Sequence, residues 1–170
     1  MPRKKSLSDA QVLADARRLH LSGGEKALTF GNLARASGLA ASTLAQRFGT
    51  IEGLIAALAR QGWQDLLDAL AALEQSTADK GPQGYLKALS PSGLDALRLL
   101  SLSTTDESAR QLAEDWRSRV VTALALRLGQ GEKARAAAAV IFATWQGQLL
   151  WGNAAQSAEM KIKDLAKKLL

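Results

Sequence analysis

The sequence predicts an all-α protein, and its aliphatic composition carries that prediction. It contains 32 Ala and 30 Leu but only 4 Ile and 4 Val. Ala and Leu favour helices, whereas strands are enriched in β-branched residues. The chain has 170 residues, 47% of them hydrophobic, which is enough for one domain or two small ones with a buried core.

The helices of the N-terminal third are predicted from their end signals. Ser8 and Gln11 form a capping box for a first helix that ends at Gly23-Gly24. Thr29 caps a short helix over residues 30–37, and Gly38 supplies the left-handed turn that follows. A third short helix covers residues 41–48.

Longer helices are expected in the rest of the chain. Thr50 caps a helix that runs to about residue 75 with a helical period of apolar residues. Two short helices are expected next, one after Gly81-Pro82 and one after Ser90-Pro91, because proline favours the first helical position. The remaining helices are expected over about 105–128, 132–153 and from Ser157 to the C-terminus, giving about nine in all.

Composition excludes several classes of function. With no Cys and His20 as the single histidine, the chain can build neither a disulfide, nor a thiolate or multi-histidine metal site, nor a Cys-His nucleophile pair. No metal or cofactor is therefore expected. Residues 136–158 lack charge, but their amide side chains favour a buried helix over a membrane span. The N-terminus lacks the apolar segment of a signal peptide, so a cytoplasmic location is expected.

The positive charge is concentrated at the N-terminus. Residues 1–50 contain 8 Lys and Arg against 3 Asp and Glu, whereas residues 51–170 contain 14 against 13. Nucleic acid is the natural partner of a basic segment, because neutralising phosphates releases counterions. A basic arm that is only a solvated tail is the alternative interpretation.

Residues 28–58 have the pattern of a helix-turn-helix. Two short helices flank a glycine turn, and apolar residues such as Leu33, Leu44 and Phe48 fall between them. The segment resembles the DNA-binding domain of the TetR (tetracycline-repressor-like) family. The helix pattern of the remaining chain is similar to that family over nearly its whole length.

The resemblance implies a homodimeric repressor that a small molecule releases from duplex operator DNA. It assigns residues 1–50 to DNA binding and residues 51–170 to a helical effector-binding and dimerisation domain. Family members usually carry a tyrosine in the recognition helix, a lysine at the start of the next helix and a serine cap. This chain has Ala45, Ile51 and Ala40 at those positions. A lost phosphate contact lowers the affinity for DNA. Three outcomes are therefore open: DNA binding is weaker, the N-terminal arm compensates, or the domain no longer regulates DNA.

The candidate DNA-binding residues lie in the arm and the two motif helices. Gln can pair with adenine and Arg with guanine, so Gln46 and Arg47 are candidate base readers, a solvated helix face being the alternative. The full set is Arg3, Lys4, Lys5, Thr29, Ser42, Thr43, Gln46 and Arg47.

A small apolar or aromatic effector is expected between the fourth helix and the helices over 93–128. The apolar sides of these helices carry the candidate residues, whereas the ionisable residues fall mostly on the polar sides. The expected pocket consists of Trp63, Leu66, Leu97, Leu100, Leu112, Trp116 and Val120. The last two helices are expected to form the dimer interface through Trp145, Leu149 and Trp151.

Two other classes of function compete with the regulator. The first is a TetR-fold protein that has lost operator binding and acts as a lipid-binding or protein-partner module. The second is an enzyme, which is disfavoured because the later helices contain no cluster of His, Cys or paired acids.

Overall fold

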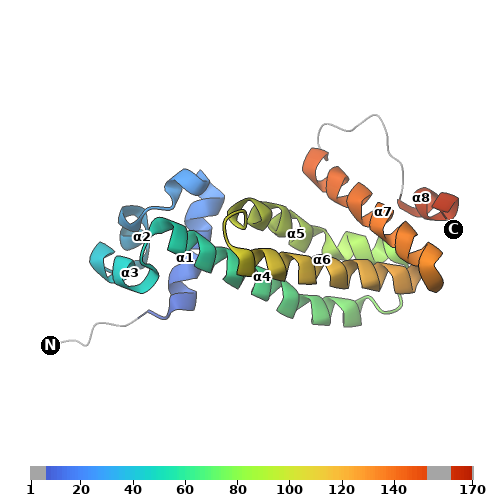
Figure 1. Cartoon of the computed structure of the whole chain (residues 1–170), viewed down its shortest axis with the longest axis horizontal. Coiled ribbons are helices and arrows are strands. Elements are labelled where there is room, and N and C mark those ends of the chain that lie inside the picture. Colours follow the sequence, from blue (N-terminus) through green and yellow to red (C-terminus); the bar gives the residue numbers. More distant parts are fainter. Residues whose placement is uncertain (1–6, 153–161, 170) are drawn as a thin grey trace. The chain divides into compact units, whose positions relative to one another are not determined.

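The computed structural model describes residues 7–152 and 162–169 (Figure 1). This part of the chain contains α-helices, one 3-10 helix and no strand, as the composition predicts. The elements are α1 (Asp9–Gly23), η1 (Glu25–Ala27), α2 (Phe30–Ser37), α3 (Ala41–Phe48), α4 (Ile51–Ser76), α5 (Pro82–Leu102), α6 (Glu107–Leu128), α7 (Gly131–Trp151) and α8 (Ile162–Leu169). None of these helices is long and apolar enough to cross a bilayer.

The chain divides into two compact units, residues 1–62 and 63–170. The division falls inside α4, whereas the sequence placed it at Thr50. The predicted boundary followed a helix cap, but the compact units are set by packing. Leu54, Leu58 and Ala59, in the first half of α4, are buried core residues.

In the first unit, local signals determine where the helices begin and end. The Ser8 backbone N–H donates to Gln11 Oε1 at 2.9 Å, and the Gln11 N–H donates to Ser8 Oγ at 3.3 Å. This is the predicted capping box of α1. Gly38 has φ 73°, a left-handed conformation that links α2 to α3 and that residues with a Cβ resist. Helix α2 packs against both α1 and α3, and Leu33 and Leu44 are fully buried.

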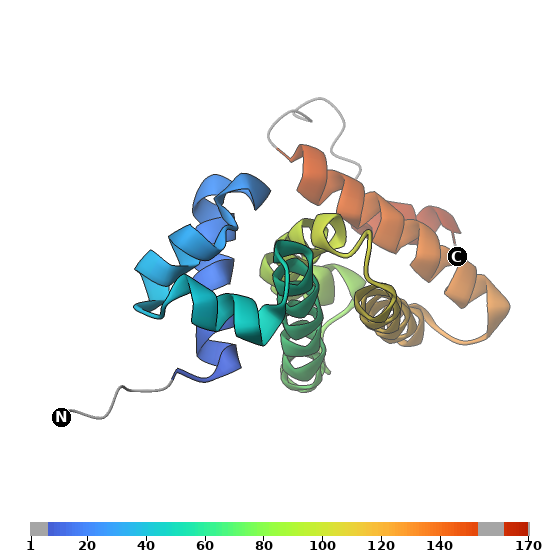
Figure 2. The same ribbon diagram turned by 60° about the vertical axis from the view of Figure 1, so that its left-hand side comes forward.

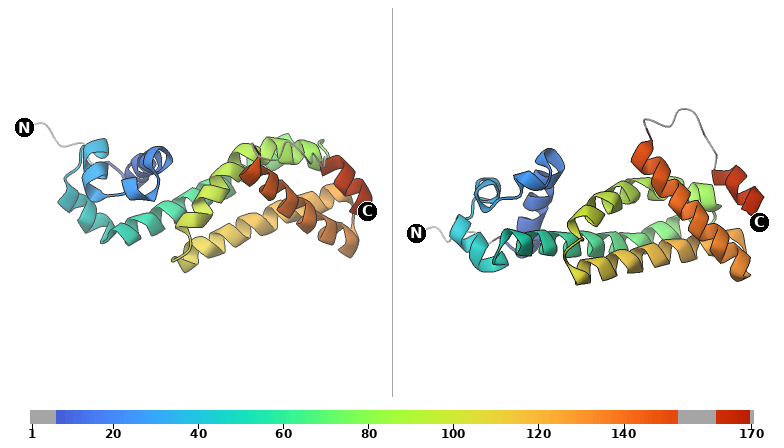
Figure 3. Two further views of the ribbon diagram at one scale, coloured as in Figure 1. Left: turned by 90° about the horizontal axis from the view of Figure 1, so that it is seen from above. Right: turned by 45° about the horizontal axis from the view of Figure 1, so that its top comes forward.

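In the second unit, α6 and α7 pack together and α5 contacts both of them. Figure 2 views α6 almost along its axis, with α7 running across it. Helix α8 packs against α5 and α7 (Figure 3). The expected start of the last helix, at Ser157, lies outside the described residues.

Helix α5 is one helix where the sequence predicted two. It contains Pro91 in its interior. Proline removes the hydrogen bond to the carbonyl four residues earlier, that of Lys87. Both Lys87 and Pro91 are exposed, so water can satisfy that carbonyl, while the buried Leu89 and Gly93 hold the helix together on its inner side. The expected count of about nine helices was therefore too high by one in this region.

Aromatic side chains connect three helices of the second unit. The ring centroids of Trp63 and Trp116 are 5.8 Å apart, those of Trp116 and Phe142 are 6.2 Å apart, and those of Phe142 and Trp145 are 5.8 Å apart. All four rings are tilted against their neighbours, an arrangement that aromatic pairs favour. The row extends from α4 through α6 to α7, and it is largely core.

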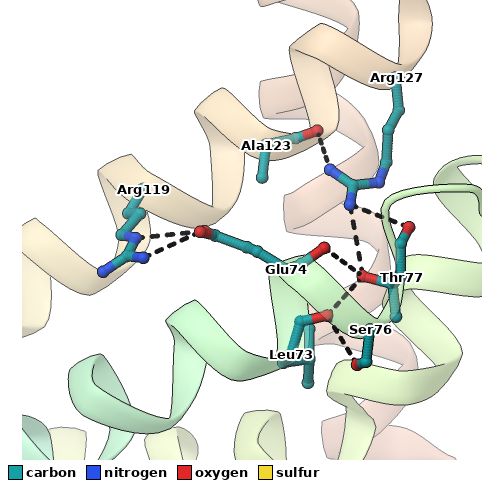
Figure 4. Close-up of polar contacts among 7 residues, drawn as sticks. All are labelled: Leu73, Glu74, Ser76, Thr77, Arg119, Ala123 and Arg127. Atoms are coloured by element: carbon teal, nitrogen blue, oxygen red, sulfur yellow. Dashed lines mark hydrogen bonds and ion pairs between the residues drawn. The ribbon is translucent and has the colours of Figure 1, made fainter.

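A polar cluster ties the end of α4 to α6 (Figure 4). Arg127 donates from Nη1 to the Ala123 carbonyl at 2.8 Å and from Nη2 to the Thr77 carbonyl at 3.2 Å. Arg119 makes two hydrogen bonds to Glu74, at 2.8 and 3.2 Å. The Arg127 guanidinium also lies over the ring of Tyr85, 4.2 Å from its centroid. These contacts fix the connection between α4 and α5 against the last turns of α6.

Candidate nucleic-acid interface and ligand cleft

Helix α3 presents a polar surface to solvent. Ser42 and Gln46 are exposed and Thr43 is half-buried, whereas Leu44 is fully buried beneath them. Ala45, at the position of the family's tyrosine, is half-buried. The candidate arm residues Arg3, Lys4 and Lys5 lie outside the described residues.

The helix ends around α3 differ in how they are capped. The Thr29 hydroxyl accepts from the Asn32 N–H at 3.1 Å and caps α2 as predicted. Ala40, at the cap of α3, makes no side-chain hydrogen bond. Thr50 caps α4 by accepting from the Gly53 N–H at 3.1 Å. The pKa of Glu52 in the first turn of α4 is lowered by hydrogen bonds from its own backbone and from Thr50.

Arg47 contacts the start of α1. Its Nη1 donates to the Leu7 carbonyl at 2.7 Å and to Asp9 Oδ1 at 3.2 Å. Arg47 is exposed, as the sequence predicted. The sequence gave no sign of this contact, whose partners lie 40 and 38 positions away. Gln46 and Arg47 are neighbours in the chain, but Arg47 is engaged within the protein.

A cleft of about 350 Å³ lies in the second unit, between α4, α5, α6 and α7. Three of the predicted pocket residues line it, namely Trp63, Leu100 and Trp116. Trp63 is fixed in place because its Nε1 donates to Ser103 Oγ at 2.9 Å, and that hydroxyl donates to the Leu99 carbonyl. The other residues of the lining were not predicted: Ser103, Thr104, Arg110, Ala113, Glu114, Arg117 and Gln146.

The other predicted pocket residues lie elsewhere. Leu66 and Val120 are buried in the core, and Leu97 and Leu112 are half-buried outside the cleft lining. All four are on the apolar sides of their helices, as predicted. Apolar periodicity identifies an inward face, but it does not distinguish a packed core from a cleft.

Charged residues line part of the cleft, although they lie at exposed positions, as expected for the polar sides of their helices. Their long side chains extend from exposed backbone positions to the cleft. Arg117 forms a two-point contact with Glu114, at 2.7 and 2.5 Å. This contact lowers the pKa of Glu114 and raises that of Arg117. Arg110 forms an ion pair with Glu107 and donates to the Thr104 carbonyl at 3.1 Å.

Trp116 combines burial with an unsatisfied donor. Its side chain is 1% exposed, and its Nε1 has no hydrogen-bond partner in the described part of the chain. A buried donor without an acceptor costs about 1–3 kcal/mol. Trp116 lines the cleft, and its indole N–H is a buried donor without an acceptor in the described part of the chain.

The predicted dimer residues lie on different sides of α7. Trp145 is 4% exposed and packs inside its own chain, with Nε1 3.4 Å from Ser90 Oγ, so its assignment to a dimer surface was wrong. Leu149 is half-buried, and Trp151 is 64% exposed. Helical spacing alone indicated that these residues were apolar, but not which side of α7 the rest of the chain covers.

Small and apolar side chains nevertheless form an exposed stripe along α7. Val140 and Leu150 are 46% and 63% exposed. We call this stripe the outer face of α7. It consists of the exposed residues Ala136, Ala139, Val140, Ala143, Leu150 and Trp151, together with the half-buried Gly147. The spacing of three and four residues places them on one side of the helix.

No protein-family model matches the sequence, and neither does any curated protein. Solved structures do match the fold. One is the reduced form of E. coli NemR, with a TM-score of 0.64 and 18% identity over 93% of this chain and 92% of that chain. Another is the fatty acid degradation regulator FadR from Bacillus halodurans, with a TM-score of 0.62 and 17% identity over 99% and 97% of the two chains.

A third is PfmR, a TetR-family transcriptional regulator from Thermus thermophilus. It matches with a TM-score of 0.58 and 17% identity over 93% of each chain. Each similarity covers more than nine-tenths of this chain and therefore reaches both units. The chain therefore has a TetR-like fold.

Proposed function

We propose that the protein is a DNA-binding transcriptional regulator that acts as a homodimer and responds to a small molecule. The observation that carries the proposal is the helix-turn-helix of α2 and α3, whose outer residues Ser42 and Gln46 are exposed. The similar folds of PfmR, a transcriptional regulator, and FadR, a regulator of fatty acid degradation, support it. The positive charge of residues 1–50 favours an anionic partner.

Selection from a random duplex library, followed by titration at several salt concentrations, tests this proposal. We expect an enriched sequence and a shallow salt dependence, because Ala45 and Ile51 replace two phosphate-binding residues. The Gln46→Ala variant should lose about 1–3 kcal/mol of discrimination at one base pair. Gln111→Ala is the matched control, since Gln111 is an exposed glutamine on α6.

A module that has lost operator binding is the second candidate, and the Ala40 cap favours it. Without a side-chain hydrogen bond at its first turn, α3 is less well fixed than in a chain with a serine cap. If selection enriches no sequence, and Ala45→Tyr with Ile51→Lys restores DNA binding, this second candidate is correct.

The cleft is the proposed effector site, and the effector is proposed to be apolar or aromatic and without a full charge. Trp63 and Trp116 offer aromatic surface. The arginines at the cleft, Arg110 and Arg117, already have carboxylate partners, so an ionised ligand would need to displace one of them. A ligand with a single hydrogen-bond acceptor would suit the Trp116 N–H.

Thermal shift and tryptophan fluorescence with lipophilic and polar metabolites test the effector proposal. Trp116→Phe removes the N–H but keeps an aromatic ring, so it should weaken ligands that carry an acceptor and spare purely apolar ones. Trp151→Phe is the control, because Trp151 is exposed outside the cleft lining. Tight binding of multiply charged metabolites, with no response to lipophilic ones, would contradict the proposal.

The outer face of α7 is proposed to bind the same face of a second copy. Exposed apolar side chains arranged along one helix are typical of an interaction surface, and small residues allow two helices to approach closely. Sedimentation should show about twice the chain mass. Val140→Arg should yield a monomer, whereas Leu126→Arg should not, because Leu126 is an exposed leucine on α6.

A further inference from the structure

We propose that Gln146 is the specificity-determining residue of the cleft, and that it selects effectors with a neutral group that carries a hydrogen-bond acceptor and a donor side by side, such as a carboxamide or a lactam. The inference rests on the proposed function, because it takes the cleft as the effector site. It narrows the effector class given there to an apolar body with one such group.

Gln146 interrupts the apolar inner side of α7. Phe142, four positions before it, is buried, and Leu149, three positions after it, is half-buried and packs close to Gly93 of α5. Residues three and four apart lie on the same side of a helix. Gln146 is half-buried between them and lines the cleft. A polar side chain that breaks an apolar pattern in this way is expected at a functional site.

The amide of Gln146 forms no hydrogen bond with the residues that the structure describes. Both of its polar atoms are accessible, because the buried side-chain atoms without a partner belong to Tyr85, Trp116 and Arg127. A glutamine amide offers two N–H donors and a carbonyl acceptor in one plane. The cleft therefore contains an accessible donor and an accessible acceptor next to each other.

The other accessible polar groups of the lining are already engaged. Ser103 Oγ accepts from Trp63 Nε1 at 2.9 Å and donates to a backbone carbonyl at 2.7 Å. The Thr104 hydroxyl donates to the Ser101 carbonyl at 3.4 Å. Both arginines of the lining have carboxylate partners. A ligand can therefore bind to the Gln146 amide without breaking a contact that the protein already makes.

The chemistry of the amide defines the group that matches it. A carboxamide can form two hydrogen bonds with Gln146, donating its N–H to Oε1 and accepting from Nε2 at its carbonyl. A ketone has no N–H and can form one of the two. A carboxylate would be repelled by Oε1, and to gain a charged partner it would have to displace Glu107 from Arg110 or Glu114 from Arg117.

The rest of the lining defines the body of the ligand. Trp63, Leu100, Ala113 and Trp116 form the apolar part of the cleft wall. The volume of about 350 Å³ falls within the range of small-molecule sites, roughly 300–1,000 Å³. A carboxamide on a body of one or two rings meets both conditions, and 2-naphthamide is a simple probe of this kind.

Isothermal titration calorimetry with three matched probes tests the inference without DNA. The probes are 2-naphthamide, 2-acetylnaphthalene, which has a methyl group in place of the amide nitrogen, and 2-naphthoate. Gln146→Leu should weaken 2-naphthamide about tenfold and 2-acetylnaphthalene about threefold, because two hydrogen bonds and one are lost. The weaker binding of 2-naphthoate should not change. Gln148→Leu is the matched control, since Gln148 is an exposed glutamine of α7 outside the cleft lining.

Three calorimetric results would overturn the inference. The first is an equal loss of affinity for all three probes in Gln146→Leu, which would show a general change in the shape of the cleft. The second is tighter binding of 2-naphthoate than of 2-naphthamide by the unaltered chain. The third is the absence of binding by all three probes.

A second experiment connects the site to DNA binding. On the selected duplex, 2-naphthamide should release the unaltered chain at a concentration about tenfold lower than it releases Gln146→Leu. No release, or release of both chains at equal concentrations, would overturn the role of Gln146 in effector selection. If the unaltered chain binds no duplex but calorimetry shows the graded losses, the proposed function fails and the ligand specificity of Gln146 stands.

Discussion

Replacing Gly93 by alanine should destabilise the second unit, although alanine is the better helix former. Gly93 is a buried glycine in α5. A Cβ built there would lie 2.7 Å from Cζ2 of Trp145, closer still to Cη2 of the same ring, and 2.6 Å from Cδ1 of Leu149. All three distances are shorter than real Cβ contacts, so α5 and α7 would have to move apart.

The magnitude follows from two opposing effects. Overpacking a close contact costs about 1–3 kcal/mol, whereas replacing glycine by alanine inside a helix gains about 0.5–1 kcal/mol. We therefore expect Gly93→Ala to range from neutral to about 2.5 kcal/mol less stable. Gly147→Ala is the matched control, because a Cβ at Gly147 in α7 has nothing within 4 Å in the single chain. Both alanine variants are made in the Val140→Arg background, in which the proposed contact between two copies is absent.

Urea unfolding, monitored by circular dichroism at 222 nm, measures the free energy of unfolding of both variants. The difference in the free energy of unfolding between Gly93→Ala and Gly147→Ala isolates the overpacking effect, which should be about 1–3 kcal/mol. Adding Trp145→Phe to Gly93→Ala should recover part of the loss, because both clashing indole atoms belong to the six-membered ring, and the phenylalanine side chain does not extend so far. Equal unfolding midpoints for the two alanine variants would refute this account of how α5 and α7 pack.

Three further changes test other parts of the molecule. Ala40→Ser should add the missing cap of α3 and raise the free energy of unfolding by about 0.5–2 kcal/mol, whereas Ala40→Val, without an acceptor, should not raise it. Burial raises the pKa of Tyr85, the single tyrosine, to about 12, with a smaller contribution from Glu74. The folded state therefore keeps the phenol proton that the unfolded state releases near pH 10, and the free energy of unfolding should fall by about 2 kcal/mol as the pH rises from 10 to 12. Absorbance at 295 nm should show ionisation near pH 12, and a Tyr85→Phe variant that declines equally would argue against this. Ser103→Ala should leave the buried Trp63 N–H without its acceptor and cost about 1–3 kcal/mol in urea unfolding, with Ser101→Ala, an exposed serine on α5, as the unaffected control.

Sequence reasoning succeeded where a local signal determines the structure. Helices α2 and α3 have the predicted bounds, because Thr29, Gly38 and Gly49 fix their ends through backbone geometry. It failed at Pro91, where local chemistry favoured a new helix start but burial of Leu89 and Gly93 kept α5 continuous. Whether a proline ends a helix depends on which side of the helix loses its hydrogen bond, and the sequence does not contain that information directly.

The candidate sites show the same limit at longer range. Apolar spacing indicated the inward residues of α4 and α6, and three of the predicted pocket residues line the cleft. The charged part of the lining could not be predicted, because an arginine on an exposed helix position reaches as far as its neighbours permit. The contact of Arg47 with Leu7 could not be predicted either, since nothing in either segment indicates the other.

The composition of α7 fits packing on two sides, of which the described chain supplies one. Its inner positions are buried against the same chain, and they include Ala134, Ala137, Ala138 and Trp145. The outer face of α7 is also poor in charged residues, but it is exposed. Packing within the single chain therefore covers only part of the apolar surface of α7. An apolar stretch of this length is costly to leave in water, and the amides of Gln146 and Gln148 are poorly suited to lipid. The proposed homodimer, in which a second copy of the same helix approaches through Ala143 and Gly147, would account for both the missing charges and the small side chains.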